Sequence, residues 1–263
     1  MLKIFKSVKE WRAFRQRDQF FGKTIGFVPT MGNLHLGHRA LIERSVREND
    51  FTVLSIFVNP TQFNNREDLE KYPRTQEADI RMVEGVRADY ILMPEYDCLY
   101  PDDYTYRVQE SVISKFMEGR SRPGHFDGML TVVLKLLQLV RATRAYFGEK
   151  DYQQLQLVRG LVDAFFIDTE IVACSTVRDE NGLALSSRNS RLSEGDYDKA
   201  VQFAKILQSE KSSKAVCERL DEMGIEVDYI EDGSGRRFGA VNVGGVRLID
   251  NYDLKVNEKV ERE

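Results

Sequence analysis

Short apolar runs alternate with amphipathic segments over the first two thirds of the chain. The runs are rich in β-branched residues, which is typical of buried strands. The segments between them repeat apolar residues every three or four positions, which is typical of helices. This alternation predicts an α/β domain with a parallel sheet. The expected strands are 24–28, 51–58, 90–93, 145–148 and 168–173, and the expected helices are about 36–48, 75–86 and 129–140, with another around Leu155, Val158, Leu161, Val162 and Phe165.

The pattern changes after about residue 175. Two charged amphipathic helices are followed by short strands around glycine-rich turns, an order that indicates a small α+β domain. We therefore expect a larger domain at 1–175 and a small C-terminal α+β domain at 176–263. The helices expected in the smaller domain are about 194–209 and 212–223, and the strands are 225–230 and 246–249.

Composition limits the classes of partner. Apolar residues make up 42% of the chain, enough for a substantial core, and the net charge is −4 with both signs interspersed, which argues against a nucleic-acid polymer as partner. The most apolar stretch, 129–140, is too short to span a bilayer, and the N-terminus has no apolar signal core. Cys98, Cys174 and Cys217 form neither a disulfide framework nor a zinc motif. A cytoplasmic protein without a membrane partner is expected.

His35 and His38 lie beside Gly37, where a predicted strand turns into a predicted helix. Ligands bind at the carboxyl ends of parallel strands, and the free N–H groups of a first helical turn attract anions. One alternative is that both are surface histidines without a role. Another is a metal site with His125 as third ligand, but the positive end of a helix repels a dication and no carboxylate sits beside the pair. We interpret the pair as phosphate contacts.

A helix terminus contributes only about 0.3–2 kcal/mol, so further cations must converge on the same phosphates. Lys150 lies in the segment 148–151, which follows another predicted strand, and the loop 185–189 carries two serines and Arg188. Guanidinium and hydroxyl groups suit phosphate oxygens. Taken singly these signals are ambiguous, because a lone lysine is usually solvated and Ser-Ser-Arg is common in linkers.

Neutral amides follow two of the predicted strands. Asn59, Gln62 and Gln154 could recognise a hydroxyl-bearing carboxylate without adding charge, although isolated amides are more often surface residues. The segment 122–127 is either a pocket wall or a plain connecting loop. The charged segment 65–74 is a candidate for a mobile lid.

Seven segments together resemble the pantoate–β-alanine ligase (pantothenate synthetase) family, within the nucleotidyltransferases marked by His-x-Gly-His. They follow the family's order and cover the chain almost end to end. The segments are FVPTMGNLHLGH (27–38), SIFVNPTQF (55–63), DLEKYPRT (68–75), RPGHFDG (122–128), YFGEKDYQQL (146–155), VRDENGLALSSRN (177–189) and RLIDN (247–251).

The resemblance implies a two-step reaction. The carboxylate of (R)-pantoate attacks the α-phosphorus of ATP and gives pantoyl adenylate and pyrophosphate. The amine of β-alanine then attacks the acyl carbon and gives pantothenate and AMP. The resemblance also implies Mg²⁺ with ATP, a homodimer, a Rossmann-like doubly wound sheet, and a small C-terminal domain that closes over the ATP site.

The resemblance also assigns roles to residues. His38 would be the acid acting on the phosphates, His35 would stabilise the same charge, and Lys150 would be the main cation. Gln62 would contact pantoate and β-alanine, and Gln154 would contact pantoate. The catalytic set is His38, His35, Lys150 and Arg188; the ATP-binding residues are Pro29, Thr30, Met31, Gly32, Asn33, Leu34, His35, Leu36, Gly37, His38, Gly148, Glu149, Lys150, Asp151, Val177, Leu185, Ser186, Ser187 and Arg188; the substrate-binding residues are Asn59, Gln62 and Gln154.

The chain departs from the family pattern at a few places. Leu185 replaces the more frequent Met, a volume-conserving change, Val140-Arg-Ala lacks the common Gln-Pro-Asp, and 193–244 matches weakly. Two other functions compete with the ligase. A nucleotidylyltransferase would need a second basic cluster in place of the amides Gln62 and Gln154. A non-catalytic nucleotide sensor would not need the intact histidines and lysine.

Overall fold

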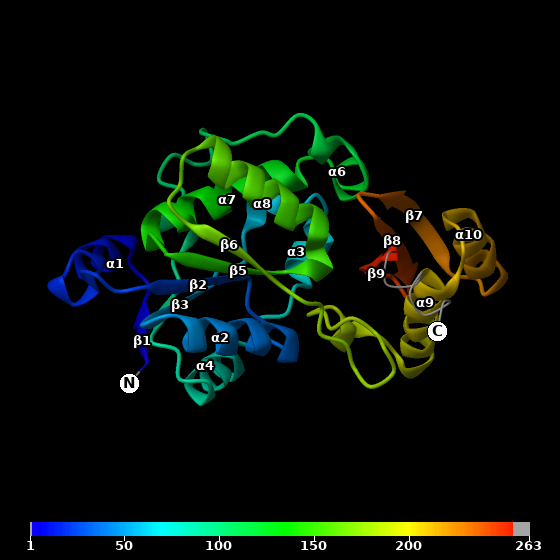
Figure 1. Cartoon of the computed structure of the whole chain (residues 1–263), viewed down its shortest axis with the longest axis horizontal. Coiled ribbons are helices and arrows are strands. Elements are labelled where there is room, and N and C mark those ends of the chain that lie inside the picture. Colours follow the sequence, from blue (N-terminus) through cyan, green and yellow to red (C-terminus); the bar gives the residue numbers. More distant parts are fainter. Residues whose placement is uncertain (1, 255–263) are drawn as a thin grey trace. The chain divides into compact units, whose positions relative to one another are not determined.

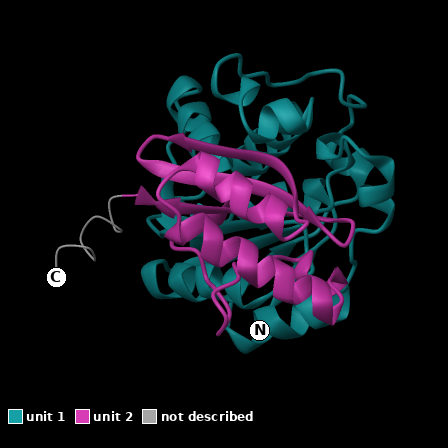
Figure 2. Ribbon diagram, turned by 90° about the vertical axis from the view of Figure 1, so that its right-hand side faces the viewer, with its two compact units in different colours: residues 1–149, 153–174 teal, residues 150–152, 175–263 magenta. Residues whose placement is uncertain are grey.

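The structure, a computed structural model, describes residues 2–254. They form two compact units, shown in teal and magenta in Figure 2. Of the described residues, one unit comprises 2–149 and 153–174, and the other comprises 150–152 and 175–254. The division expected at 175/176 left Lys150–Tyr152 in the N-terminal domain, whereas their contacts group them with the C-terminal unit. Met1 and 255–263, which the expected domains included, lie outside the described residues.

The larger unit contains a sheet covered by helices. Its strands are β1 (Lys3–Phe5), β2 (Ile25–Thr30), β3 (Phe51–Ile56), β4 (Tyr90–Leu92), β5 (Arg144–Gly148) and β6 (Glu170–Cys174). Its helices are α1 (Val8–Arg15), α2 (Leu36–Glu48), α3 (Arg66–Glu70), α4 (Gln76–Gly85), α5 (Tyr96–Leu99), α6 (Glu118–Ser121), α7 (His125–Val140) and α8 (Tyr152–Ala164).

The sheet is six-stranded, parallel throughout, and ordered β1-β4-β3-β2-β5-β6. The chain passes outward from β2 through β3 to β4 and then returns to the other side of β2 for β5 and β6. Helices α2 and α4 cover one face of the sheet, and α7 and α8 cover the other (Figure 1). This confirms the predicted Rossmann-like, doubly wound α/β fold and places a strand-order reversal between β2 and β5.

Helix α7 is buried on several sides, as its nearly continuous apolar sequence predicts. It begins four residues earlier than expected, because Gly124 with φ of 79° forms its N-cap and His125 and Phe126 enter the core. Of the helices within residues 2–254, none is both long and apolar enough to cross a membrane.

The first strand and helix were not predicted. Strand β1 has only three residues among lysines, so its pattern is too short to read. The aromatic residues of this region pack around Tyr90, whose ring centroid lies 6.4, 6.0 and 5.3 Å from those of Phe5, Trp11 and Phe14. Burial of these large rings, rather than local propensity, holds the N-terminal segment on the sheet.

The smaller unit is the predicted α+β domain with one additional strand. It contains α9 (Glu194–Ser209), α10 (Ser213–Glu222) and an antiparallel sheet of β7 (Glu226–Gly233), β8 (Arg236–Val243) and β9 (Val246–Asp253), in that order. The central strand β8 was missed because it opens with two arginines. Arg237 is nevertheless only 2% exposed, since its guanidinium pairs with Asp232 at 2.8 Å.

Candidate functional site

The segment 29–38 forms the turn from β2 to α2 at the carboxyl edge of the sheet. Gly32 and Asn33 have positive φ, 84° and 49°, which glycine adopts freely and asparagine tolerates. The Thr30 hydroxyl donates to the Ser55 carbonyl at 2.7 Å and accepts from the Gly32 N–H at 3.2 Å. These two hydrogen bonds fix the position of Thr30, where the turn begins. The turn lies next to the strand-order reversal, which is where ligands of such sheets bind.

Asp79, on α4, holds the middle of this turn. Its carboxylate accepts the N–H groups of Asn33 at 3.0 Å and Leu34 at 2.8 Å, and the hydroxyl of Thr75 at 3.1 Å. Asp79 is 2% exposed, so water does not compete for these contacts. A Cβ on Gly32 would lie 3.1 Å from the carboxylate, which limits this position to a small residue. Asp79 was not predicted, because a lone acid on a helix does not reveal a partner 45 residues away.

His35 and His38 cap the start of α2. The Nδ1 atom of His35 accepts the Gly37 N–H at 3.1 Å, and the Nδ1 atom of His38 accepts the His35 N–H at 3.3 Å. Their ring centroids lie 4.1 Å apart. A neutral imidazole whose Nδ1 accepts carries its proton on Nε2. Both rings therefore carry an Nε2–H donor at the positive end of a helix, where anions are attracted, and their role as phosphate contacts stays a prediction.

His125 has a different environment. Its Nδ1 contacts the Gln62 carbonyl at 2.8 Å, and its Nε2 contacts an Arg122 guanidinium nitrogen at 3.1 Å. Because arginine only donates, Nε2 is the acceptor and Nδ1–H the donor. Both ring nitrogens of this buried histidine are engaged with protein groups. The geometry therefore disfavours His125 as the third ligand of a metal site and gives it a role in holding Gln62.

All four hydrogen-bonding positions of the Asn59 side-chain amide are occupied by protein groups. Its oxygen accepts from the hydroxyls of Tyr100 and Thr61, both at 3.0 Å, and its NH₂ donates to the Gly128 carbonyl and Gln62 Oε1, both at 3.1 Å. Burial raises the pKa of Tyr100 to about 12, so its hydroxyl remains a donor at neutral pH. Two donors and two lone pairs are the full capacity of an amide. These contacts favour an orienting role, and direct contact of Asn59 with substrate stays a prediction.

The orientation of Gln62 follows from that of Asn59. Since Gln62 Oε1 faces Asn59, its Nε2 points to the Met31 sulfur, 3.1 Å away. Helix α7 packs closely against the Gln62 backbone at Gly128. A Cβ on Gly128 would lie only 2.6 Å from the Gln62 backbone nitrogen. The side-chain NH₂ of Gln62 is thus held beside the 29–38 turn, and its contact with substrate stays a prediction.

A cavity of about 490 Å³ adjoins the 29–38 turn. It is lined by Met31 and Asn33 of the turn, by Tyr96, and by Pro73 and Arg74 of the predicted lid, among other residues. The lid segment is partly ordered by its own contacts. It contains α3, capped by the Asn65 side chain, and Tyr72 is buried with its ring centroid 5.7 Å from that of Phe63. The role of this segment as a lid stays a prediction.

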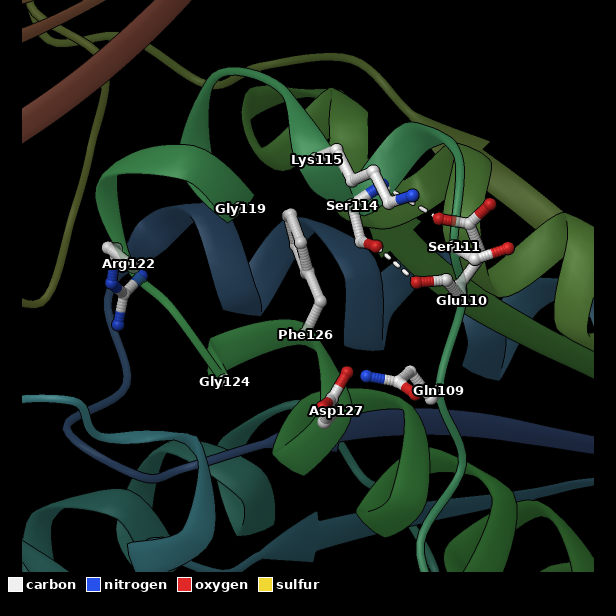
Figure 3. A pocket seen from close by; sticks show the side chains of 10 residues that line it. All are labelled: Gln109, Glu110, Ser111, Ser114, Lys115, Gly119, Arg122, Gly124, Phe126 and Asp127. Carbon is white, nitrogen blue, oxygen red and sulfur yellow. Dashed lines mark hydrogen bonds between the residues drawn. The ribbon is translucent and has the colours of Figure 1, made fainter.

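A second cavity, of about 360 Å³, is lined by the RPGHFDG segment (Figure 3). Arg122, Gly124, Phe126 and Asp127 contribute to its wall, together with residues near Glu110. The segment is therefore a pocket wall rather than a plain connecting loop. Burial raises the pKa of Asp127 from its ordinary value.

Two adjacent glutamines on α8 differ in environment. Gln153 is buried, and its side chain accepts the Glu118 N–H at 3.1 Å and donates to the carbonyls of Ile113 and Phe116 at 2.8 Å. Gln154, the predicted pantoate contact, is half-buried. Gln153 thus organises the preceding segment, a role that the sequence could not separate from that of its neighbour.

Within the smaller unit, the predicted ATP residues Val177 and Leu185 lie opposite each other in a hairpin. The Leu185 N–H donates to the Val177 carbonyl at 2.9 Å, and Arg178 bridges to Ala184. The loop beyond turns at Ser186, whose hydroxyl accepts the Arg188 N–H at 3.3 Å. The structure therefore brings both ends of the VRDENGLALSSRN segment together.

Lys150 lies in a short 3₁₀ turn, Glu149–Asp151, after β5. Its side chain is 17% exposed, and its ammonium lies 3.8 Å from the Asp151 carboxylate. The predicted ATP residues are consequently divided between the units. Residues 29–38 with Gly148 and Glu149 belong to the larger unit, and Lys150, Asp151, Val177 and 185–188 belong to the smaller one.

We expect Asp79→Asn to impair the turn without unfolding the larger unit. The amide offers a donor where the carboxylate accepts an N–H, so one contact is lost, and hydrogen bonds to charged groups contribute about 1.5–3 kcal/mol each. Turnover with saturating substrates should fall by about tenfold, because a loss of about 1.4 kcal/mol in the transition state corresponds to that factor. Glu77→Gln, the same change on an exposed part of α4, is the matched control. Equal turnover in both variants would contradict the role given to Asp79.

Comparison with known proteins shows the family of this chain. The family model for pantoate-beta-alanine ligase matches residues 3–253. A pantothenate synthetase from Coxiella burnetii (strain Dugway 5J108-111) is 54% identical over 98% of this chain and 100% of its own length. One from Legionella pneumophila (strain Corby) is 51% identical over 96% and 100%.

Solved structures give the same result. A pantoate-beta-alanine ligase from Francisella tularensis, complexed with beta-gamma ATP and beta-alanine, superposes with a TM-score of 0.92 at 41% identity. The match covers 97% of this chain and 98% of that one. A pantothenate synthetase from Thermus thermophilus has a TM-score of 0.88 at 38% identity, over 96% and 99% of the two chains. The chain belongs to the pantoate–β-alanine ligase family.

Proposed function

We propose that this ligase forms pantothenate from (R)-pantoate and β-alanine through a pantoyl-adenylate intermediate. In the first step, a pantoate carboxylate oxygen bonds to the α-phosphorus of ATP and pyrophosphate leaves. In the second, the β-alanine amine bonds to the acyl carbon, AMP leaves with the bridging oxygen, and the amine loses a proton. The observation that carries the proposal is the set of fixed neutral donors of His35, His38 and Gln62 around one turn.

The phosphate side of the reaction is electrostatic. The Nε2–H groups of His35 and His38, at the positive end of α2, supply donors to phosphate oxygens. A helix end contributes about 0.3–2 kcal/mol, while catalysis requires roughly 8 kcal/mol or more. Lys150 and Arg188 are therefore proposed to add charge on the same phosphates, with Ser186 and Ser187 as further donors. Closure of the C-terminal domain over the ATP site, which the family resemblance implies, is part of this proposal.

The substrate side of the reaction is neutral. Gln62 presents Nε2–H and not a cation, so a pantoate carboxylate can be oriented there without losing nucleophilicity to a strong ion pair. We propose that Gln62 contacts pantoate and β-alanine, that Gln154 contacts pantoate, and that Asn59 acts by orienting Gln62. Neutral recognition also favours the ligase over a nucleotidylyltransferase with a phosphorylated acceptor.

Mg²⁺ is proposed to accompany ATP. Both carboxylate oxygens of Asp79 already accept N–H groups, and within residues 2–254 no group of three or more His, Cys, Asp or Glu side chains is arranged to hold an ion. Mg²⁺ commonly keeps waters and phosphate oxygens as ligands and takes only one or two carboxylates from the protein. The residues present therefore fit an ion held chiefly by the triphosphate, where it would neutralise charge.

Three further features belong to the proposal. A lid at 65–74 would exclude water from the hydrolysable adenylate, and unchanged adenylate leakage after its deletion would count against it. A homodimer and a cytoplasmic location are expected from the family.

Transfer of labelled oxygen from the pantoate carboxylate tests the mechanism. We expect one labelled oxygen in the phosphate of AMP, because the bridging oxygen of the adenylate comes from pantoate and leaves with AMP. AMP release should require both pantoate and β-alanine. Pantothenate formation with unlabelled AMP would refute the adenylate route. A stable dinucleotide product would point to a nucleotidylyltransferase, and ATP binding without turnover would point to a nucleotide sensor.

A further inference from the structure

The turn Lys150–Tyr152 is clamped by two strands of the C-terminal sheet. The side-chain amide of Asn251, near the end of β9, donates to the Lys150 carbonyl at 2.9 Å. The Asn251 oxygen accepts from Arg236 Nε, at the start of β8, at 2.8 Å. The Arg236 guanidinium lies 4.5 Å from the centroid of the Tyr152 ring. Two side chains thus hold both ends of the turn.

The direction of these contacts is fixed by chemistry. Arginine can only donate, so the oxygen of the Asn251 amide must face Arg236 and its NH₂ must face the Lys150 carbonyl. Asn251 is 3% exposed, so water does not replace the contact easily. A lysine side chain is long and flexible, and it reaches a defined point only if its backbone is held.

Asp250, the residue before Asn251, attaches the hairpin that contains Arg178 to the same strand. The Asp250 carboxylate accepts hydrogen bonds from the two terminal guanidinium nitrogens of Arg178, at 2.6 and 2.9 Å, and from the Asn251 N–H at 2.8 Å. Arg178 lies in the hairpin that leads to Leu185–Arg188. Adjacent residues of β9 therefore hold the Lys150 turn and this hairpin.

We propose that Asn251, oriented by Arg236, is a positioning residue for Lys150. Together with Asp250 it sets the Lys150 ammonium and the 185–188 loop in one arrangement, so that both meet the phosphates of a single nucleotide. Asp250 and Asn251 are adjacent on β9 and belong to the RLIDN segment. The proposal gives this segment a role, whereas the proposed reaction steps assign it none. The inference rests on the proposed function of Lys150.

Asn251→Asp tests the inference with little change in size. The carboxylate still accepts from Arg236 but places an oxygen against the Lys150 carbonyl. We expect KM for ATP to rise by about tenfold, the equivalent of one lost hydrogen bond, while KM for pantoate stays unchanged. Asn242→Asp, at a half-buried position of β8 outside the clamp, is the matched control. A merely structural role would change both KM values or neither.

A double-mutant cycle sharpens the result. If Asn251 acts through Lys150, then Asn251→Asp should not weaken ATP binding further in a Lys150→Ala background, measured calorimetrically. Arg236→Lys keeps the charge but loses the Nε donor, so it should raise KM for ATP by a smaller factor. This variant replaces Asn251→Asp in the experiment if Asn251→Asp does not fold. ATP kinetics like those of Asn242→Asp, or an undiminished effect in the Lys150→Ala background, would overturn the inference. Normal ATP binding and turnover in Lys150→Ala itself would instead refute the proposed role of Lys150.

Discussion

His38→Asn is expected to lower adenylate formation by about 10²–10³-fold, the loss typical of one donor to a developing charge. The asparagine oxygen lies near the place of Nδ1, so the contact with the His35 N–H is kept. The Nε2–H donor at the phosphate is lost. Formation of adenylate and pyrophosphate in a single turnover, measured by rapid quench, reports the effect directly.

His38→Gln is the matched control, because its amide nitrogen reaches near the place of Nε2. It should retain more activity than His38→Asn, because a side-chain N–H donor remains near the place of Nε2. Lys150→Ala should also abolish adenylate formation with the fold intact. Near wild-type pyrophosphate release in His38→Asn and Lys150→Ala would remove both assigned roles.

Asp250→Ala is expected to destabilise the smaller unit by about 3–5 kcal/mol, because it leaves a largely buried guanidinium without its partner. The Asp250 side chain is 2% exposed and that of Arg178 is 22% exposed. Desolvation by burial opposes the charge of Arg178, yet the contacts with Asp250 raise its pKa above the ordinary value. Because the intrinsic pKa of a guanidinium lies far above neutral, Arg178 stays charged in the variant but lacks its carboxylate partner.

Urea unfolding followed by circular dichroism measures this loss. The only tryptophan, Trp11, lies in the larger unit, so its fluorescence does not report on the smaller one. Glu218→Ala is the control, since its pair with Lys214 at 3.6 Å is exposed and such pairs contribute about 0–1 kcal/mol. An effect of Asp250→Ala no larger than that of Glu218→Ala would show that the buried pair does not hold the hairpin.

The larger elements of the fold were predictable because their signals are local. The helix at 36–48 was predicted with the bounds of α2, and that at 194–209 with the bounds of α9. Apolar periodicity and capping residues lie within the segment itself. Strands β1 and β8 were missed, because burial of their residues depends on partners elsewhere in the chain.

The candidate site shows the same division. The strand–turn–helix setting of His35 and His38 was visible in the sequence, since glycines and histidines at fixed spacing report a turn with an anion site. The role of His125 was not, because its contact with the Gln62 carbonyl joins residues 63 apart. Neither was the saturation of Asn59, which depends on Tyr100 and Gly128.

The sequence by itself therefore determined the fold class and the strand–turn–helix segment at 29–38, and its motifs indicated the family. Local periodicity, turn chemistry and motif spacing suffice for these. Only the tertiary structure decided the tautomers of the histidines, the donor that Gln62 presents, the hold of Asp79 on the turn, and the attachment of Lys150 to the smaller unit. The physical reason is that hydrogen bonding and burial depend on which distant segments meet, and neither is encoded in the spacing of the residues concerned.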